Sequence, residues 1–179
     1  MSDAGLGVGA ALETYKQLVC SPQYELTDVF LGPSYSDISI KVELDKASLK
    51  YTQPDHIENA LGELLATGSL IARFYGRLEY GPRGLGNRSI LYQATDTCVN
   101  ECLNQRLNRT EFMPFAPITL FEYRHSCYLN VNDKSNAEMF MTITRECTSE
   151  MCSQSPAVVH LDKTARPQIV SKSNNPFIW

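Results

Sequence analysis

The chain has 179 residues and a net charge of −4, and 43% of its residues are hydrophobic. That length suits one domain with a sizeable core, and that composition excludes a disordered chain. No apolar run approaches the ~20 residues that span a bilayer, and the first ten residues lack the features of a signal peptide, so we expect a cytoplasmic protein without a membrane partner. The acidic balance argues against a surface that binds a nucleic-acid backbone.

The first elements are predicted to be a helix, a connector and a strand. Residues 5–19 predict a helix with a glycine-rich beginning, and the turn residues within 20–35 indicate a connector. Residues 36–44 alternate apolar and polar side chains, which predicts a strand with one apolar face made of Ile38, Ile40, Val42 and Leu44.

The next elements surround a glycine-rich loop. A helix that Thr52 or Gln53 can cap is predicted to end at Gly68. A strand is predicted at 69–75, and the loop follows at 76–88.

Beyond the loop, Thr97 is predicted to cap a helix with a buried side formed by Val99, Cys102, Leu103 and Leu107. Further strands are predicted at 118–123, 138–144, 157–161 and, briefly, 168–170. Because helices and strands interleave, the expected class is α/β or α+β, with a mixed sheet.

The segment 73–89 concentrates arginine and glycine. Its one acid, Glu79, stands against four arginines, so its local charge is 4 − 1 = +3; the arginines are Arg73, Arg77, Arg83 and Arg88. Glycine lets the backbone approach a ligand closely, and arginine offers a planar fork of donors for phosphate or carboxylate oxygens. The segment therefore predicts an anion-binding loop, and the alternative is a flexible surface loop with solvated arginines. It is not a Walker loop, because the chain contains no G-K-[S/T].

Two later segments carry further candidates. In 108–117, the prolines stiffen the backbone and the phenylalanines can anchor it in the core. Arg109 is the candidate functional residue of this segment, and a rigid loop through the core is the alternative. In 158–168, a predicted buried strand ends in polar residues, at the kind of sheet edge where open α/β folds bind ligands. These polar residues are His160, Asp162, Thr164 and Arg166. A structural histidine is the alternative for His160.

The six cysteines predict free, reduced thiols. None forms a C-x-x-C pair, and a chain without an export signal does not need a disulfide framework. A zinc site can be imagined from His125, Cys127, Cys147 and Cys152, but these spacings match no usual pattern, so we assign no metal ligand.

Three stretches of the chain, in order, resemble the carbamoyltransferase family that includes the nodulation-factor, cephamycin and tobramycin O-carbamoyltransferases. The family pattern reads GRMEFGPRALGNRSIL, then K-x-R-E-x-F-R-P-F-A-P, then PAVTHVDGTARVQTV. The counterparts here are GRLEYGPRGLGNRSIL at 76–91, LNRTEFMPFAP at 107–117 and PAVVHLDKTARPQIV at 156–170. LGPSY at 31–35 and GLGVGAAL at 5–12 also fit, so the resemblance spans nearly the whole chain.

The resemblance implies a YrdC-like fold, in which helices flank a twisted mixed sheet. In this family the YrdC-like domain takes ATP and carbamoyl phosphate and forms carbamoyl-adenylate. A sugar-kinase-like N-terminal domain, which holds a metal, then passes the carbamoyl group to a substrate hydroxyl. ATP is thus the implied cofactor, with Mg²⁺ as a candidate companion, and no metal is assigned to this chain.

Carried over residue by residue, the resemblance implies a cationic cradle for phosphate groups, with catalytic roles for Arg83, Arg88 and Arg109. It implies nucleotide or substrate binding by Asn87, Ser89, His160, Thr164 and Arg166. Fixed donors of this kind stabilise developing charge by about 3 kcal/mol each when they are well placed.

Three departures from the family pattern bear on activity. The lysine of the second stretch is replaced by Leu107 or Asn108, and its following arginine is Met113, so two cations are lost unless other arginines compensate. Lys163 stands where the family has glycine. The chain ends at Trp179, before the family's N-T-S-F-N nucleotide motif.

We therefore expect a fragment: residues 1–24 as the end of the sugar-kinase-like domain plus a connector, and 25–179 as an incomplete C-terminal domain. Its expected partners are ATP, carbamoyl phosphate and the missing N-terminal domain, and alone it should not catalyse the transfer. Two alternatives stay open. One is a non-catalytic YrdC-like module that binds RNA or another phosphate-rich partner; the other is an inert remnant whose exposed apolar surface favours self-association.

Overall fold

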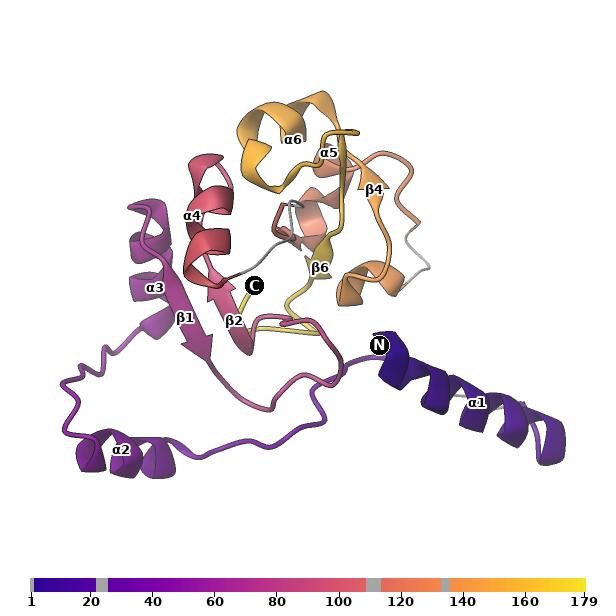
Figure 1. Cartoon of the computed structure of the whole chain (residues 1–179), viewed down its shortest axis with the longest axis horizontal. Helices are drawn as coiled ribbons and strands as arrows, with labels where there is room; N and C mark the ends of the chain where they lie inside the picture. The colour runs from indigo at the N-terminus through magenta and orange to yellow at the C-terminus, as the bar shows by residue number, and fades with distance from the viewer. Residues whose placement is uncertain (1, 22–25, 109–113, 133–135) are drawn as a thin grey trace. The chain divides into compact units, whose positions relative to one another are not determined.

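A computed structural model of the chain describes residues 2–21, 26–108, 114–132 and 136–179. The chain divides into two compact units, Met1–Leu91 and Tyr92–Trp179. Both units contain helices and short strands (Figure 1), which confirms the mixed α/β class. The predicted boundary between residues 24 and 25 stays a prediction. Within the described ranges, every helix is too short or too polar to span a bilayer.

The first unit begins with two helices, one predicted and one not. Helix α1 (Ser2–Leu18) confirms the N-terminal helix. Helix α2 (Asp37–Lys46) shows that the strand predicted at 36–44 is wrong. The side chain of Ser36 caps α2 by accepting a hydrogen bond from the backbone N–H of Ser39 at 3.2 Å. Charges complementary to the helix dipole lie at both ends, so local capping outweighs the alternation of β-branched residues.

A third helix and a two-stranded sheet complete this unit. Helix α3 (Ile57–Ala66) begins later than the predicted caps, with His56 as its N-cap, and Gly68 follows it with φ +79°. Strand β1 (Ile71–Phe74) confirms the strand predicted at 69–75, and it pairs antiparallel with β2 (Arg88–Leu91), which was not predicted. Residues 75–87 connect the two strands and are called the arginine loop below.

The second unit is built from short elements. Its two described sheets each have two strands: β3 pairs parallel with β6, and β4 pairs antiparallel with β5. The described strands therefore form three small sheets, where we had expected one mixed sheet. In order, the elements are α4 (Cys98–Arg106), β3 (Ile118–Leu120), η1 (Phe121–Tyr123), α5 (Arg124–Cys127), η2 (Ala137–Phe140), β4 (Arg145–Glu146), α6 (Ser149–Gln154), η3 (Pro156–Val158), β5 (Thr164–Ala165) and β6 (Gln168–Val170).

The strands predicted in this unit have mixed outcomes. The strand at 168–170 is confirmed as β6, and only the first half of 118–123 is a strand, β3. The strand at 138–144 is wrong, because η2 covers its beginning and Met141 follows with a left-handed backbone, φ +53°. The strand at 157–161 is also wrong, because Pro156 begins the 3₁₀ turn η3 and its fixed φ favours a helical turn.

Helix α4 has the predicted position but a different cap. The side chain of Thr97 makes no capping bond, and the carboxylate of Asp96 accepts from the N–H of Cys98 at 2.9 Å. Val99 and Leu103 are buried as predicted. Cys102, however, is exposed, and so is Leu107, because the helix presents a narrower apolar face than its sequence suggested.

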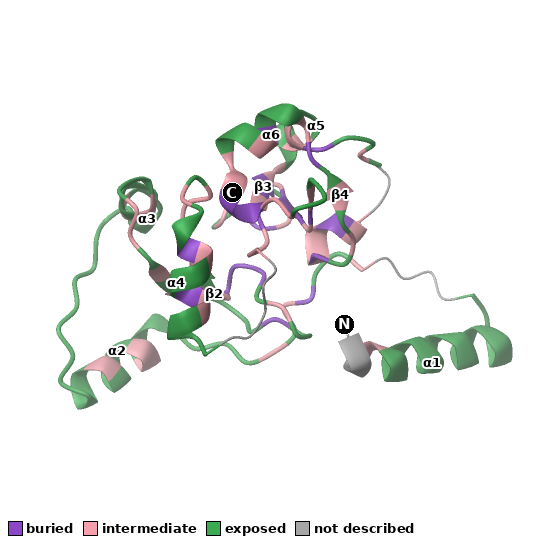
Figure 2. Ribbon diagram, turned by 45° about the horizontal axis from the view of Figure 1, so that its top comes forward, coloured by how far each residue is buried: buried purple, intermediate pink, exposed green. Residues whose placement is uncertain are grey.

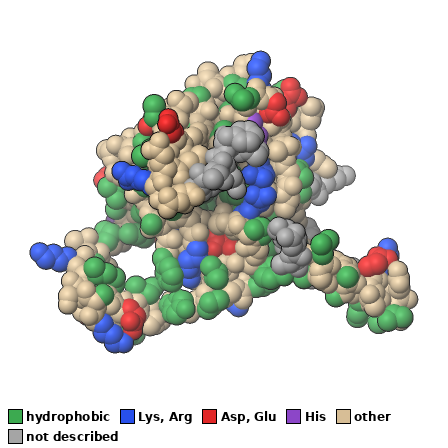
Figure 3. All heavy atoms as spheres, viewed as in Figure 1, with side chains coloured by type: hydrophobic (Ala, Val, Ile, Leu, Met, Phe, Trp, Pro, Cys, Tyr) green, Lys and Arg blue, Asp and Glu red, His purple; other side chains and the backbone are tan. Residues whose placement is uncertain are grey.

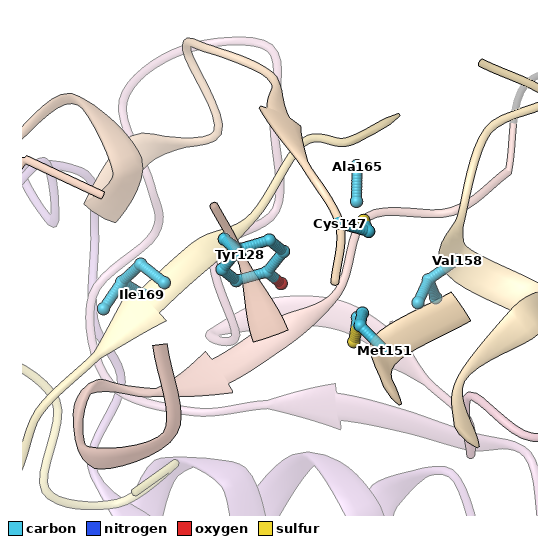
Figure 4. Close-up of a cluster of buried hydrophobic side chains, with 6 residues drawn as sticks. All are labelled: Tyr128, Cys147, Met151, Val158, Ala165 and Ile169. Atoms are coloured by element: carbon cyan, nitrogen blue, oxygen red, sulfur yellow. The ribbon is translucent and has the colours of Figure 1, made fainter. Parts of the chain in front are cut away.

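Most of the buried apolar side chains lie in the second unit. One cluster, shown in Figure 4, comprises Tyr128, Cys147, Met151, Val158, Ala165 and Ile169. The hydroxyl groups of Tyr128 and Thr119 lie 2.6 Å apart, so this buried phenol is hydrogen-bonded. In the first unit most of the helical surface is exposed (Figure 2). Its buried side chains lie in the arginine loop and at one upstream position whose backbone contacts the loop: Glu79, Leu85 and Asn87, and Val29.

Candidate anion-binding loop

Glu79, the one acid of the arginine loop, holds the loop together. Its side chain is buried, with 7% of the residue exposed. Its carboxylate accepts hydrogen bonds from three backbone N–H groups: from Leu85 at 2.7 Å, from Asn87 at 2.8 Å and from Arg88 at 3.1 and 3.2 Å. The loop is thus wrapped around a carboxylate, and these three N–H groups are directed at Glu79 instead of outward.

The segment 73–89 contains four arginines, and three of them donate to backbone carbonyls. Arg73 donates to Gly86, and Arg77 donates to Leu31 and Gly32 at 3.0 and 3.1 Å. Arg88 donates to Tyr75, to Asn87 at 3.2 Å and to Gly76 at 3.0 Å, so it joins the two ends of the loop. Burial lowers the pKa of Arg73, yet arginine stays protonated throughout the physiological range. These contacts tie Arg73, Arg77 and Arg88 to the backbone, but Arg77 is exposed, so the surface loop with solvated arginines stays an alternative.

Arg83 differs from the other three arginines of the segment 73–89. It is half-buried, and it forms no hydrogen bond or ion pair with any residue that the structure describes. Its guanidinium donors are therefore without a protein partner in the described part of the chain, in a loop whose backbone is held by Glu79.

Two side chains predicted to shape the loop contact its backbone. The buried Asn87 donates from Nδ2 to the carbonyl of Arg77 at 2.8 Å, and the hydroxyl of Ser89 accepts from the N–H of Gly86 at 2.9 Å. Gly84 is packed tightly, since an added Cβ would lie 2.7 Å from both Arg88 O and Ser89 Oγ. Asn87 and Ser89 therefore fix the conformation of the loop; their predicted contact with a nucleotide stays a prediction.

The upstream motif LGPSY lies against this loop. Leu78 exchanges backbone hydrogen bonds with the segment, accepting from Gly32 at 2.9 Å and donating to Pro33 at 3.0 Å. Tyr80 donates to Val29 at 2.7 Å. A Cβ on Gly32 would lie 2.6 Å from the Cβ of Leu78, so the close approach requires glycine. Two motifs that are far apart in the sequence thus form one substructure.

The third motif forms a tight turn in the second unit. His160 and Asp162 lie between η3 and β5, Thr164 begins β5 and Arg166 follows it, so the prediction that these polar residues end a buried strand is wrong. Asp162 accepts from the N–H and the hydroxyl of Thr164 at 3.0 and 2.8 Å, and His160 Nδ1 lies 3.1 Å from that hydroxyl. Hydrogen bonds from Thr164 lower the pKa of the Asp162 carboxyl. His160, Asp162 and Thr164 are therefore brought together, as the sequence predicted.

Lys163 occupies the central position of this turn with a left-handed backbone, φ +63°. Glycine adopts such a conformation without the steric penalty of a Cβ. The backbone at the position where the resemblance expects glycine is thus one that favours glycine.

The predicted catalytic and binding residues do not all lie in one unit. Arg83 and Arg88 belong to the first unit, and Arg166, which is half-buried between β5 and β6, belongs to the second together with His160. Arg109 lies outside the described residues. The convergence of these groups on one ligand therefore stays a prediction.

Sequence reasoning missed Glu79 as a structural centre. It had counted the residue only as one negative charge. The signal that could have found it is an acid followed by a glycine-rich run, because such a run exposes several N–H groups that need an acceptor.

The cysteines are free, and Cys147 is buried while Cys20, Cys98 and Cys102 are exposed. Burial raises the pKa of the Cys147 thiol to about 11. Among the described residues, no group of three or more His, Cys, Asp or Glu side chains is placed to hold a metal ion.

Comparison with known proteins places these motifs in a wider context. Residues 62–179 match the family described as "Carbamoyltransferase C-terminus". The chain is 33% identical to nodulation protein NolO of Bradyrhizobium diazoefficiens, over 99% of this chain and 33% of that protein.

It is also 29% identical to 3'-hydroxymethylcephem-O-carbamoyltransferase of Streptomyces clavuligerus, over 98% of this chain and 31% of that protein. An uncharacterized protein of Methanocaldococcus jannaschii is 34% identical over 98% of this chain and 30% of its own length. The chain thus spans 30–33% of the length of these three curated relatives.

Proposed function

This chain belongs to the carbamoyltransferase C-terminal family, and we propose that it is the part of an O-carbamoyltransferase that binds ATP and carbamoyl phosphate. One relative is named for O-carbamoyl transfer, which motivates the reaction class. In the proposed reaction, carbamoyl phosphate, ATP and one water give carbamoyl-adenylate, phosphate and pyrophosphate. A substrate hydroxyl then takes the carbamoyl group and AMP leaves. Every reactant but water is anionic, so the site must gather positive charge.

Arg83 carries this proposal. It is the arginine of the loop whose guanidinium makes no hydrogen bond or ion pair with the described part of the chain. An arginine presents two parallel N–H groups to phosphate oxygens, and such charge-assisted bonds are the strong ones. Arg83 would therefore contact a phosphate group directly.

The geometry of the loop explains why a side chain, and not the backbone, would contact the phosphate group. In many phosphate-binding loops, backbone N–H groups point at the ligand. Here the N–H groups of Leu85, Asn87 and Arg88 are directed at Glu79. Recognition in this part of the loop would then depend on the guanidinium groups, and Arg88 would add charge while holding the ends of the loop.

Further candidates for ligand binding come from other parts of the chain. His160, Thr164 and Arg166 would contact the nucleotide or the substrate, with the orientation of the histidine set by its contact with Thr164. Arg109 would supply a further cation. Mg²⁺, if it accompanies ATP, would be held mainly by the phosphate oxygens.

Calorimetric titration of the chain with ATP, and separately with carbamoyl phosphate, tests the proposal. Loss of hydrogen bonds to a charged group costs about 1.5–3 kcal/mol, so Arg83→Ala should weaken binding roughly 10- to 150-fold. Arg83→Lys should recover part of the affinity, because it keeps the charge and loses the fork. Arg106→Ala is the matched control, since Arg106 is an exposed arginine on α4.

Two outcomes would refute the proposal: unchanged affinity in Arg83→Ala, or no binding of either ligand by the wild-type chain. Titration with double-stranded RNA at two salt concentrations addresses the non-catalytic alternative. Tight binding with a steep salt dependence would favour the RNA-binding module.

A further inference from the structure

Two exposed aromatic rings lie next to the arginine loop. Tyr35 and Phe74 are 57% and 56% exposed, and their ring centroids are 5.8 Å apart with an interplanar angle of 38°. Tyr35 ends the LGPSY motif, and Phe74 ends β1. Exposed aromatic pairs of this size leave a large apolar area in water, which is typical of a surface that a ligand covers.

Arg88 connects this pair to the loop. Phe74 faces Arg88 across the β1–β2 ladder, and the guanidinium carbon of Arg88 lies 3.6 Å from the centre of the Phe74 ring. The same guanidinium donates to the carbonyls of Tyr75 and Gly76. One side chain therefore stacks on Phe74 and holds the beginning of the arginine loop.

We propose that Tyr35 is the stacking surface for the adenine base of the nucleotide, with Phe74 and the Arg88 guanidinium as its support. This inference rests on the proposed function. Since Arg88 covers one face of Phe74, Tyr35 is the ring of the pair that is better placed to receive a base. Bases stack on aromatic rings and on arginine planes in many binding sites.

The combination of groups favours a nucleotide over an apolar partner. A nucleotide joins a planar base to a polyanion, and this unit joins an aromatic pair to a segment with a local charge of +3. The positive charge would repel a basic partner and would be left unpaired under a purely apolar one. Figure 3 shows exposed hydrophobic side chains interspersed with those of Lys and Arg. Tyr35 and Phe74 are two neighbouring exposed rings with a guanidinium stacked on one of them.

Two ligands separate the base from the phosphates: ATP, and inorganic tripolyphosphate, which lacks a base. Tyr35→Ala should weaken ATP binding about 5- to 150-fold, the range for loss of one aromatic stacking partner. Tripolyphosphate and carbamoyl phosphate should bind the variant as tightly as they bind the wild type. Tyr35→Phe should retain ATP affinity, and Tyr123→Ala, which removes another exposed tyrosine, should have no effect.

The outcomes distinguish this inference from the function on which it rests. Wild-type affinity for ATP in Tyr35→Ala would overturn the adenine site and leave the phosphate site intact. An equal loss for ATP and tripolyphosphate would also overturn it, because Tyr35 would then act on the loop and not on the base. If the wild-type chain binds none of the three ligands, both proposals fail. A circular-dichroism melt of each variant checks that the fold is kept.

Discussion

Replacing Glu79 with glutamine changes one oxygen of the buried carboxylate into an N–H₂ group and removes its charge. The remaining oxygen can still accept from Leu85 and Asn87, whose N–H groups both bond to Oε1. The new amide donor, however, would replace Oε2, so the N–H of Arg88 would keep its 3.1 Å contact with Oε1 and lose its 3.2 Å contact with Oε2. The variant therefore removes the negative charge of the acceptor from the hydrogen bonds of all three N–H groups. It also places the N–H₂ group of glutamine beside the N–H of Arg88.

The expected cost follows from these contacts. Hydrogen bonds to charged groups contribute about 1.5–3 kcal/mol, against about 1 kcal/mol for neutral ones, so the weakened set should cost about 2–3 kcal/mol. Two measurements check this value: urea unfolding for the whole chain, and amide hydrogen exchange of peptides within 80–89 for local opening of the loop. Exchange of the N–H groups at Leu85 and Asn87 should accelerate roughly 30- to 150-fold if the loop opens by that amount.

Glu63→Gln is the matched control, because Glu63 is an exposed glutamate on α3. Surface substitutions of this kind change the free energy of unfolding by no more than about 0.5 kcal/mol. The reasoning is refuted if Glu79→Gln unfolds and exchanges like this control. Faster exchange throughout the chain, with no excess at 80–89, would equally show that the carboxylate does not hold the loop.

Further predictions concern backbone and thiol positions. Lys163→Gly should raise the free energy of unfolding by about 1 kcal/mol, because glycine avoids the left-handed penalty; a lower melting temperature would contradict this. Gly32→Ala should lower the free energy of unfolding by about 1–3 kcal/mol through the clash with Leu78. An unchanged melting temperature would show that the LGPSY segment and the arginine loop can separate freely. The pKa of Cys147 is about 11 in the folded state and about 8.5 in an unfolded chain, so the folded thiol keeps its proton longer. That contribution to stability is complete below about pH 8.5 and is lost as the pH rises toward 11. Urea titrations across this window should show a steeper fall in wild type than in Cys147→Ala; equal slopes would exclude Cys147 as the cause.

The sequence predicted elements well where a strong local signal agreed with the surroundings. Helices α1, α3 and α4 and strands β1 and β6 lie where periodicity and glycine placed them. It failed at 36–44, where alternation suggested a strand while Ser36 and Asp37 supplied a helix start. It failed again at 157–161, where an apolar run after Pro156 is buried as a turn. Burial alone does not distinguish these states, because a buried turn and a buried strand have similar composition.

The candidate site shows why motif reading identifies residues more readily than it assigns their roles. The glycine and arginine content of 73–89 predicted a structured cationic loop, yet composition treats its arginines as equivalent. In the structure three of them donate to backbone carbonyls, and Arg83 makes no such bond in the described residues. That difference depends on which backbone carbonyls lie within reach of each guanidinium once the loop is folded around Glu79. Since such an assignment is a property of the folded backbone, and follows from no single residue type, Arg83 could be named from the sequence but could not be separated from Arg88.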